Sequence, residues 1–219
     1  QNVIERIDGA TGAVTVNAEV VFREVEQEVF VCPTWAGGKD WEAGAYSPRT
    51  HTMYYPLRNT CAQMLATANF ESDRAQALTR GGQGGLAIYS LAARHQIAPG
   101  TDNLGTVRAI SAETGETSWL FETRAGTMSL VATGGRLLFG GDTNGRFRAF
   151  SQETGEILWE INLGSPVSGF PISFGVDGRQ YIAVATGSGG TASHFMGLTP
   201  ELRPSSGNNL FVFALPDRQ

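Results

Sequence analysis

Two nearly identical stretches constrain the fold of this chain more than any other feature. The segment AISAETGETSW occupies residues 109–119, and AFSQETGEILW repeats it forty residues later, at 149–159. In each copy, alternating β-branched and aromatic residues lie on both sides of a Thr-Gly turn, which predicts two antiparallel strands joined by that turn. Strands that recur at this period are typical of the β-propeller.

The residues between and around the two copies extend the pattern. TMSLVATGG and RLLFGGDTNG, between the copies, predict two further strands, and TNG is a strong hairpin signal. One period therefore holds about four short strands, which is one propeller blade. Further strands are expected in RIDGATGAV, in GFPISFGVDGRQ and YIAVATGSGG with a turn at Asp177-Gly178, and in NNLFVFALP. We expect an all-β fold in which residues 1–219 form one propeller domain of about 3.5 blades.

One segment breaks this rhythm. Residues 62–100 contain QMLATANFESDRAQAL, which could carry a helical turn, and a glycine cluster. We expect an irregular insertion there. Because a propeller needs at least about four blades to close, two alternatives stand: the chain oligomerises, or it is a fragment of a longer propeller. Because Gln1 is expected to lie inside a blade, we favour the second alternative, a fragment of a longer propeller.

Composition excludes several classes of protein. With 16 Lys and Arg against 21 Asp and Glu, the net charge is −5, which disfavours binding to nucleic acid or to an anionic membrane. No apolar run is long enough for a membrane span. Without a C-x-x-C motif, the two cysteines, Cys32 and Cys61, predict neither a zinc site nor a covalent haem. They could form a disulfide or remain buried thiols.

Several motifs resemble one known family. The repeat A-x-x-x-x-T-G-x-x-x-W resembles the tryptophan-docking motif of the quinoprotein alcohol dehydrogenases, in which the indoles, here Trp119 and Trp159, pack between neighbouring blades. Three further segments resemble the family in the same order: CPTWAGGKDWEAGAYSP, LVATGGRLLFGGDTNGRFRAF and GRQYIAVATGSGG. LFVFALP resembles its last strand. The resemblance implies the C-terminal half of an eight-bladed propeller that holds pyrroloquinoline quinone (PQQ) with calcium or a lanthanide.

The resemblance also implies cofactor-binding residues. Asp40-Trp41 stands where the family has an Asn-Trp pair against the quinone, although Trp41 could instead be an ordinary aromatic residue between blades. Asp in place of Asn can only accept when ionised, so its backbone is the more favourable contact. Gly189 and Gly190 would let the backbone approach the cofactor closely, although a plain hairpin turn would have the same sequence.

Three positions bear on the substrate. Thr191 and Thr127 stand at or near positions where family members have Trp, and both are expected to border the cofactor. Two missing indoles imply a more open or more polar pocket, suited to a sugar, a sugar alcohol or a polyol. His194, just past the glycine turn, could line the substrate entrance or could be an ordinary loop histidine.

The family resemblance raises the expectation of a disulfide between Cys32 and Cys61, which fits an oxidising periplasm. The family's metal ligands, catalytic Asp and adjacent-cysteine ring lie N-terminal to the matching region. No catalytic or metal-binding residue is therefore expected here, and an N-terminal companion chain, separated by nicking after a basic residue, would supply them together with the metal.

The sequence thus predicts part of a periplasmic enzyme that oxidises an alcohol by hydride transfer to PQQ, with a cytochrome c as electron acceptor. The alternative is a non-enzymatic propeller scaffold of the bacterial envelope. The C-P-x-x-x-G-G-x-x-W segment beginning at Cys32 favours the enzyme, because a scaffold has no need of that loop.

Overall fold

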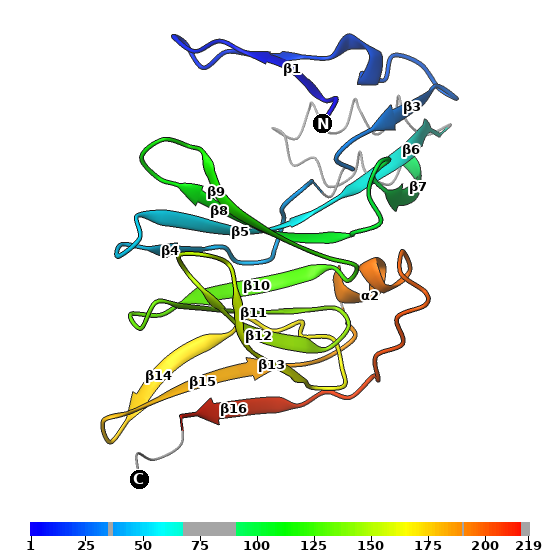
Figure 1. The fold of residues 1–219 in the computed structure, drawn as a ribbon. Coiled ribbons are helices and arrows are strands. Elements are labelled where there is room, and N and C mark those ends of the chain that lie inside the picture. The colour runs from blue at the N-terminus through cyan, green and yellow to red at the C-terminus, as the bar shows by residue number, and fades with distance from the viewer. Residues whose placement is uncertain (35–36, 68–90, 190, 216–219) are drawn as a thin grey trace, which may run out of the picture. The chain divides into compact units, whose positions relative to one another are not determined.

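Almost all of the regular secondary structure in the described residues is β-strand (Figure 1). The computed structural model describes residues 1–34, 37–67, 91–189 and 191–215, without the side chains of Leu91 and Thr191. The chain forms two compact units, each built from two separate stretches of sequence. The smaller unit comprises Gln1–Gly38 and Thr60–Gly100, and the larger comprises Lys39–Asn59 and Thr101–Gln219. No helix in the described residues is long and apolar enough to cross a membrane.

The smaller unit contains two sheets. One is the hairpin of β1 (Ile4–Ile7) and β2 (Val14–Val16), followed by a short 3-10 helix, η1 (Ala18–Val20). The other sheet has the order β3-β6-β7, built from β3 (Glu28–Val31), β6 (Thr60–Ala66) and β7 (Leu91–Ile97). Valines of β3 pack against Ala62 and Met64 of β6.

The predicted disulfide is confirmed. Cys32, directly after β3, bonds to Cys61 in β6 with an S–S distance of 2.02 Å. The irregular insertion predicted over 62–100 is wrong at both ends, because residues 62–66 belong to β6 and residues 91–97 form β7, paired antiparallel with β6. The rest of the predicted helical turn, beyond residue 67, lies outside the described residues.

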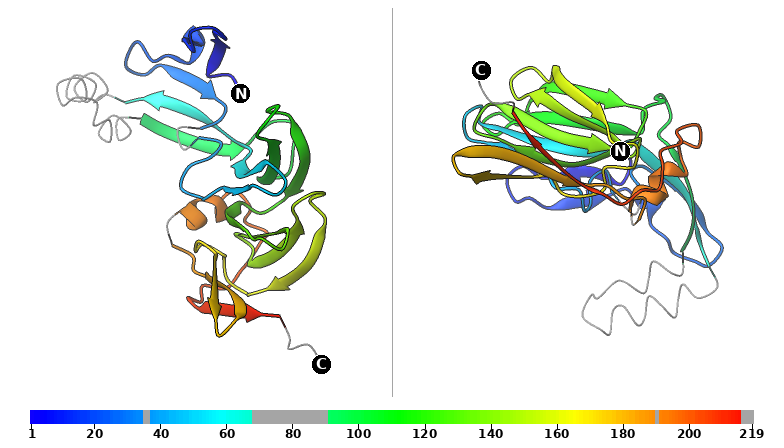
Figure 2. Two further views of the ribbon diagram at one scale, coloured as in Figure 1. Left: turned by 90° about the vertical axis from the view of Figure 1, so that its left-hand side faces the viewer. Right: turned by 90° about the horizontal axis from the view of Figure 1, so that it is seen from below.

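The larger unit holds three sheets that follow one another along it, with β16 at one end (Figure 2). The first sheet comprises β4 (Ala45–Ser47), β5 (Thr52–Arg58), β8 (Gly105–Ser111) and β9 (Thr117–Thr123). The second comprises β10 (Thr127–Ala132), β11 (Leu137–Asp142), β12 (Arg146–Ser151) and β13 (Ile157–Asn162). The third comprises β14 (Ile172–Val176), β15 (Arg179–Ala185) and β16 (Leu210–Ala214), and a short helix, α2 (Thr191–Met196), lies between β15 and β16 in sequence.

The strands predicted from the repeat are confirmed. One copy forms the β8–β9 hairpin and the other forms β12–β13, with Gly115 and Gly155 at φ of 75° and 74° in their turns. The second sheet is the predicted four-stranded antiparallel unit. The turn between β14 and β15 is also as predicted, because Asp177 and Gly178 both have positive φ.

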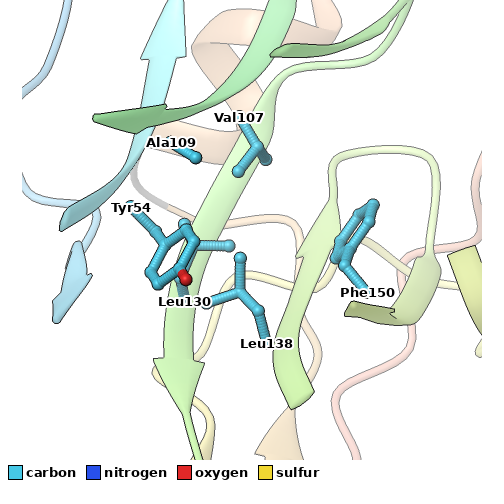
Figure 3. Close-up of a cluster of buried hydrophobic side chains, with 6 residues drawn as sticks. All are labelled: Tyr54, Val107, Ala109, Leu130, Leu138 and Phe150. Carbon is cyan, nitrogen blue, oxygen red and sulfur yellow. The ribbon is translucent and has the colours of Figure 1, made fainter. Parts of the chain in front are cut away.

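The main core of the larger unit lies between its first two sheets (Figure 3). Six side chains form it: Tyr54, Val107 and Ala109 from the first sheet, and Leu130, Leu138 and Phe150 from the second. The buried Tyr54 hydroxyl donates a hydrogen bond of 2.9 Å to the backbone carbonyl of Gln152. This bond joins β5 of the first sheet to the residue that follows β12 of the second sheet.

Trp119 docks on the turn of the second copy of the repeat. Its indole Nε1 donates to the Gln152 carbonyl at 3.0 Å. Its ring lies so close to Gly155 that a Cβ added there would be 2.6 Å from Trp119 Cε3. Trp159 occupies the equivalent position one sheet later and packs edge-on against Phe147 and Phe213, with centroid distances of 6.2 and 5.3 Å. Both tryptophans therefore link neighbouring sheets.

Candidate cofactor-binding hollow

A hollow of about 640 Å³ opens on the larger unit. The lining combines two aromatic rings, a buried carboxylate, small polar groups and glycine backbone. Its residues are Trp41, Glu42, Met128, Ser129, Ser168, Phe170, Thr186, Gly187, Gly189 and Asn208. They come from the segment before β4, from β10, from the segment before β14, and from the segments after β15 and before β16.

The position of Trp41 is fixed by the backbone contacts of the residues that follow it rather than by packing of its indole ring. The side chain is 73% exposed, so the packing of the indole fixes little. The following residues are tied down, because the Ala43 N–H donates to Ser129 Oγ at 3.0 Å and the Ala43 carbonyl accepts from the Leu130 N–H at 2.9 Å. A Cβ on Gly44 would be only 2.8 Å from the Tyr54 carbonyl.

Another part of the lining includes glycine backbone next to the ends of β15 and β16. The Thr186 N–H donates to the Asn209 carbonyl at 2.8 Å, which joins the end of β15 to the start of β16. Beside it, a Cβ on Gly187 would be 2.6 Å from Asn208 Oδ1, whereas Gly189 has open space around it. Gly189 therefore presents its main chain to the hollow without a side chain in the way.

The structure brings two of the sequence-predicted cofactor residues into one hollow, Trp41 and Gly189. Asp40 is exposed beside Trp41, and its backbone carbonyl accepts a bond of 3.2 Å from Lys39 Nζ. Thr191 begins α2. Gly190 lies outside the described residues.

Thr127 stands apart from the hollow. Its hydroxyl is buried between strands and is positioned to donate to the carbonyls of Leu57 and Thr106, at 3.1 and 3.0 Å. The next two residues, Met128 and Ser129, line the hollow instead. Cofactor contact by Thr127 remains a prediction to which these bonds lend no support.

His194 lies on α2 and is not part of the lining. Desolvation, and second the nearby Arg58 guanidinium, lower its pKa below the ordinary histidine value. The neutral imidazole is therefore favoured at neutral pH. Its place at a substrate entrance remains a prediction.

A buried ion pair beside the hollow was not predicted from the sequence. Arg58, the last residue of β5, donates from Nη2 to Glu42 Oε2, and both side chains are almost fully buried. The Arg58 guanidinium also lies over the ring of Phe195 in α2, 4.3 Å from its centroid. The only sequence signal was a charged residue that ends the alternating strand 52–58.

The described residues contain no group of three or more His, Cys, Asp or Glu side chains that could hold a metal ion. The hollow's lining also has no Lys or Arg. The buried Asp142, at the end of β11, accepts from Arg148 Nη1 at 2.6 Å and from two backbone N–H groups of its own turn. It is a structural carboxylate.

Comparison with known proteins gives a consistent result. The family described as "Glucose/ethanol/alcohol dehydrogenase, beta-propeller domain" matches residues 123–182. Quinoprotein ethanol dehydrogenase of Pseudomonas putida is 32% identical over 86% of this chain and 29% of its own length. The 1-butanol dehydrogenase (quinone) of Thauera butanivorans is 30% identical over 87% of this chain and 29% of its own length. The chain thus spans less than a third of these relatives.

Solved structures match over nearly the whole chain. A europium-containing methanol dehydrogenase has a TM-score of 0.77 at 25% identity and covers 98% of this chain, which spans 39% of that protein. The quinohemoprotein alcohol dehydrogenase of Comamonas testosteroni has a TM-score of 0.74 at 22% identity, over 97% of this chain and 31% of that one, and supports the fold alone. Together with the docked Trp119, these matches show that the chain belongs to the family of PQQ-dependent quinoprotein alcohol dehydrogenases, as part of their β-propeller.

Proposed function

We propose that this chain forms one wall of the PQQ pocket and part of the ring of a periplasmic dehydrogenase that oxidises an alcohol. The observation that carries the proposal is the shared hollow, which Trp41, Gly187 and Gly189 line together. PQQ, when bound, would supply the two-electron oxidant for the alcohol. The disulfide between Cys32 and Cys61 supports an oxidising compartment.

The residues of the hollow fit a flat, oxygen-rich cofactor. The exposed indole of Trp41 offers a face on which a planar ring system can stack. Gly187 and Gly189 leave backbone within reach, and Ser168 and Asn208 add polar groups. Because the lining has no cation, counter-charges for the carboxylates of PQQ must come from the rest of the ring.

The exposed apolar surface of the third sheet supports a companion that completes this ring. Strands β14 and β16 carry large hydrophobic side chains that are exposed: Ile172, Phe174, Val176, Leu210 and Val212. An apolar surface of this kind marks a contact with another part of a protein. The full ring of the family has eight blades. We infer that the N-terminal blades of that ring cover this apolar surface. They would also bring the metal ion, calcium or a lanthanide, and the catalytic base. A cytochrome c would then take the electrons.

For the substrate we propose a sugar, a sugar alcohol or another polyol. Threonine at 191 and near position 127, where family members have tryptophan, and the polar side chains of Ser168 and Asn208 in the hollow support a hydroxylated substrate. In the assembled enzyme, we expect kcat/KM for polyols and sugars to exceed that for ethanol. Rates with ethanol far above those with any polyol would contradict this assignment.

Replacing Trp41 by alanine tests the cofactor assignment. In the assembled protein, W41A is expected to weaken PQQ binding roughly tenfold, because one aromatic stacking face contributes about 0.5–1.5 kcal/mol in addition to the apolar area it buries. Calorimetric titration with PQQ measures the change. The matched control is L158A, which truncates an exposed residue of β13 outside the hollow and should leave the affinity unchanged. Equal affinities for W41A and the wild type would contradict stacking on Trp41.

A further inference from the structure

We propose that Arg58 is a positioning residue for the hollow, holding the Trp41 segment and helix α2 to a single buried guanidinium. The inference rests on the proposed function, because it treats the hollow as a cofactor wall. It concerns a side chain that lines no part of the hollow and acts through its contacts with Glu42 and Phe195.

The first contact reaches the wall that carries Trp41. Glu42 follows Trp41 directly, and its carboxylate accepts from Arg58 Nη2. The side chains of Arg58 and Glu42 are only 1% and 3% exposed. A charge buried this deeply is strongly destabilising when its partner is removed, so the pair fixes the backbone at Glu42. Since Trp41 is largely exposed, that backbone determines where the indole points.

The second contact reaches the wall formed after β15. Helix α2 begins two residues after Gly189, and its Phe195 is fully buried beneath the Arg58 guanidinium. Phe195 also packs closely on Gly126, where an added Cβ would be 3.3 Å from Phe195 Cβ. A guanidinium over an aromatic ring in a desolvated site is a favourable contact. Arg58 thereby holds α2 at a fixed distance from the Glu42 segment.

The pair has polar capacity that the described residues leave unused. Glu42 Oε1 and Arg58 Nε and Nη1 are buried and have no hydrogen-bond partner among the described residues. A pair optimised only for stability would be replaced at little cost by apolar side chains of similar size. A role in positioning two walls explains why this incompletely satisfied pair lies beside the hollow.

The test compares two buried arginines. Arg58→Met removes the buried guanidinium that is proposed to hold the Trp41 segment and helix α2 together, called the Arg58 clamp below. Glu42→Met/Arg58→Met removes both charges and so avoids an unpaired buried carboxylate. Arg148→Met is the matched control, because Arg148 is also buried, pairs with Asp142 and lies over an aromatic ring, Phe121, yet lines no part of the hollow.

Two readouts separate the clamp from the proposed function. The first needs no cofactor: in the full chain labelled with 5-fluorotryptophan, the fluorine resonance of Trp41, assigned with W41F, reports its order. The second is the PQQ dissociation constant of the assembled protein. We expect both Arg58 variants to broaden or shift the Trp41 resonance and to weaken PQQ binding roughly tenfold. The double variant should nevertheless have a melting temperature close to that of the wild type. R148M should lower the melting temperature and leave both readouts unchanged.

An unaltered Trp41 resonance in the double variant would overturn the inference, as would the same change in R148M. If the wild-type assembly fails to bind PQQ, the proposed function fails. The fluorine resonance still decides whether Arg58 orders the Trp41 segment.

Discussion

Replacing Gly155 by alanine is expected to lower the free energy of unfolding by about 3 kcal/mol. The added Cβ would lie 2.6 Å from Cε3 of the docked Trp119, and overpacking a close contact typically costs about 1–3 kcal/mol. The φ of 74° adds backbone strain, worth about 1 kcal/mol for a residue with a side chain. Urea denaturation followed by circular dichroism measures the difference.

The control variant is Gly134→Ala, since Gly134 has no atom within 4 Å of an added Cβ and no positive φ. It should change stability by only a few tenths of a kcal/mol. In a Trp119→Ala background, the cost of Gly155→Ala should fall to the backbone strain alone, which a double-mutant cycle isolates. A cost that is the same in both backgrounds would contradict docking of the indole on this turn.

Removing the disulfide by Cys32→Ala/Cys61→Ala is expected to destabilise the smaller unit by about 3–4 kcal/mol, the chain-entropy value for a loop of this length. The bridge joins residues 29 apart and ties the end of β3 to β6. Hydrogen exchange should show the loss at the paired strands around Val31 and Ala62. The strands that pair Phe150 with Leu138 in the larger unit should change little.

Reductant provides the control for this change. It should destabilise the wild-type chain and leave the double alanine variant unaffected, because that variant has no bond to reduce. A wild-type chain with two titratable thiols before reduction would contradict the bridge.

Much of the fold could be predicted because local patterns and packing agree. The Thr-Gly turns at 115 and 155 need positive φ, alternation sets the flanking strands, and Trp119 docks where the repeat places it. The segment at 62–100 misled because its strands, β6 and β7, belong to the smaller unit, whereas β5, just before them in sequence, belongs to the larger unit. β6 follows β5 after one residue, Asn59, yet pairs with β3 in the other unit. Local patterns carry no signal for such non-local pairing.

The site was less predictable for the same reason. Trp41 and Gly189 are far apart in sequence and share a hollow only because β10 and the third sheet place them there. Thr127 is predicted from the sequence to border the cofactor, and the sequence gives no sign that its hydroxyl bonds to the carbonyls of Leu57 and Thr106. Arg58 and Glu42 are sixteen residues apart and carry no motif. Their pairing depends on the tertiary path of the chain between them.

Native mass spectrometry of the protein from its source tests the central claim most directly. The account predicts a complex heavier than this 23.4 kDa chain, which on denaturation releases PQQ together with the remaining blades of the ring. A particle that contains only this chain or copies of it, with no quinone, would contradict the enzyme assignment and favour a propeller scaffold without a cofactor.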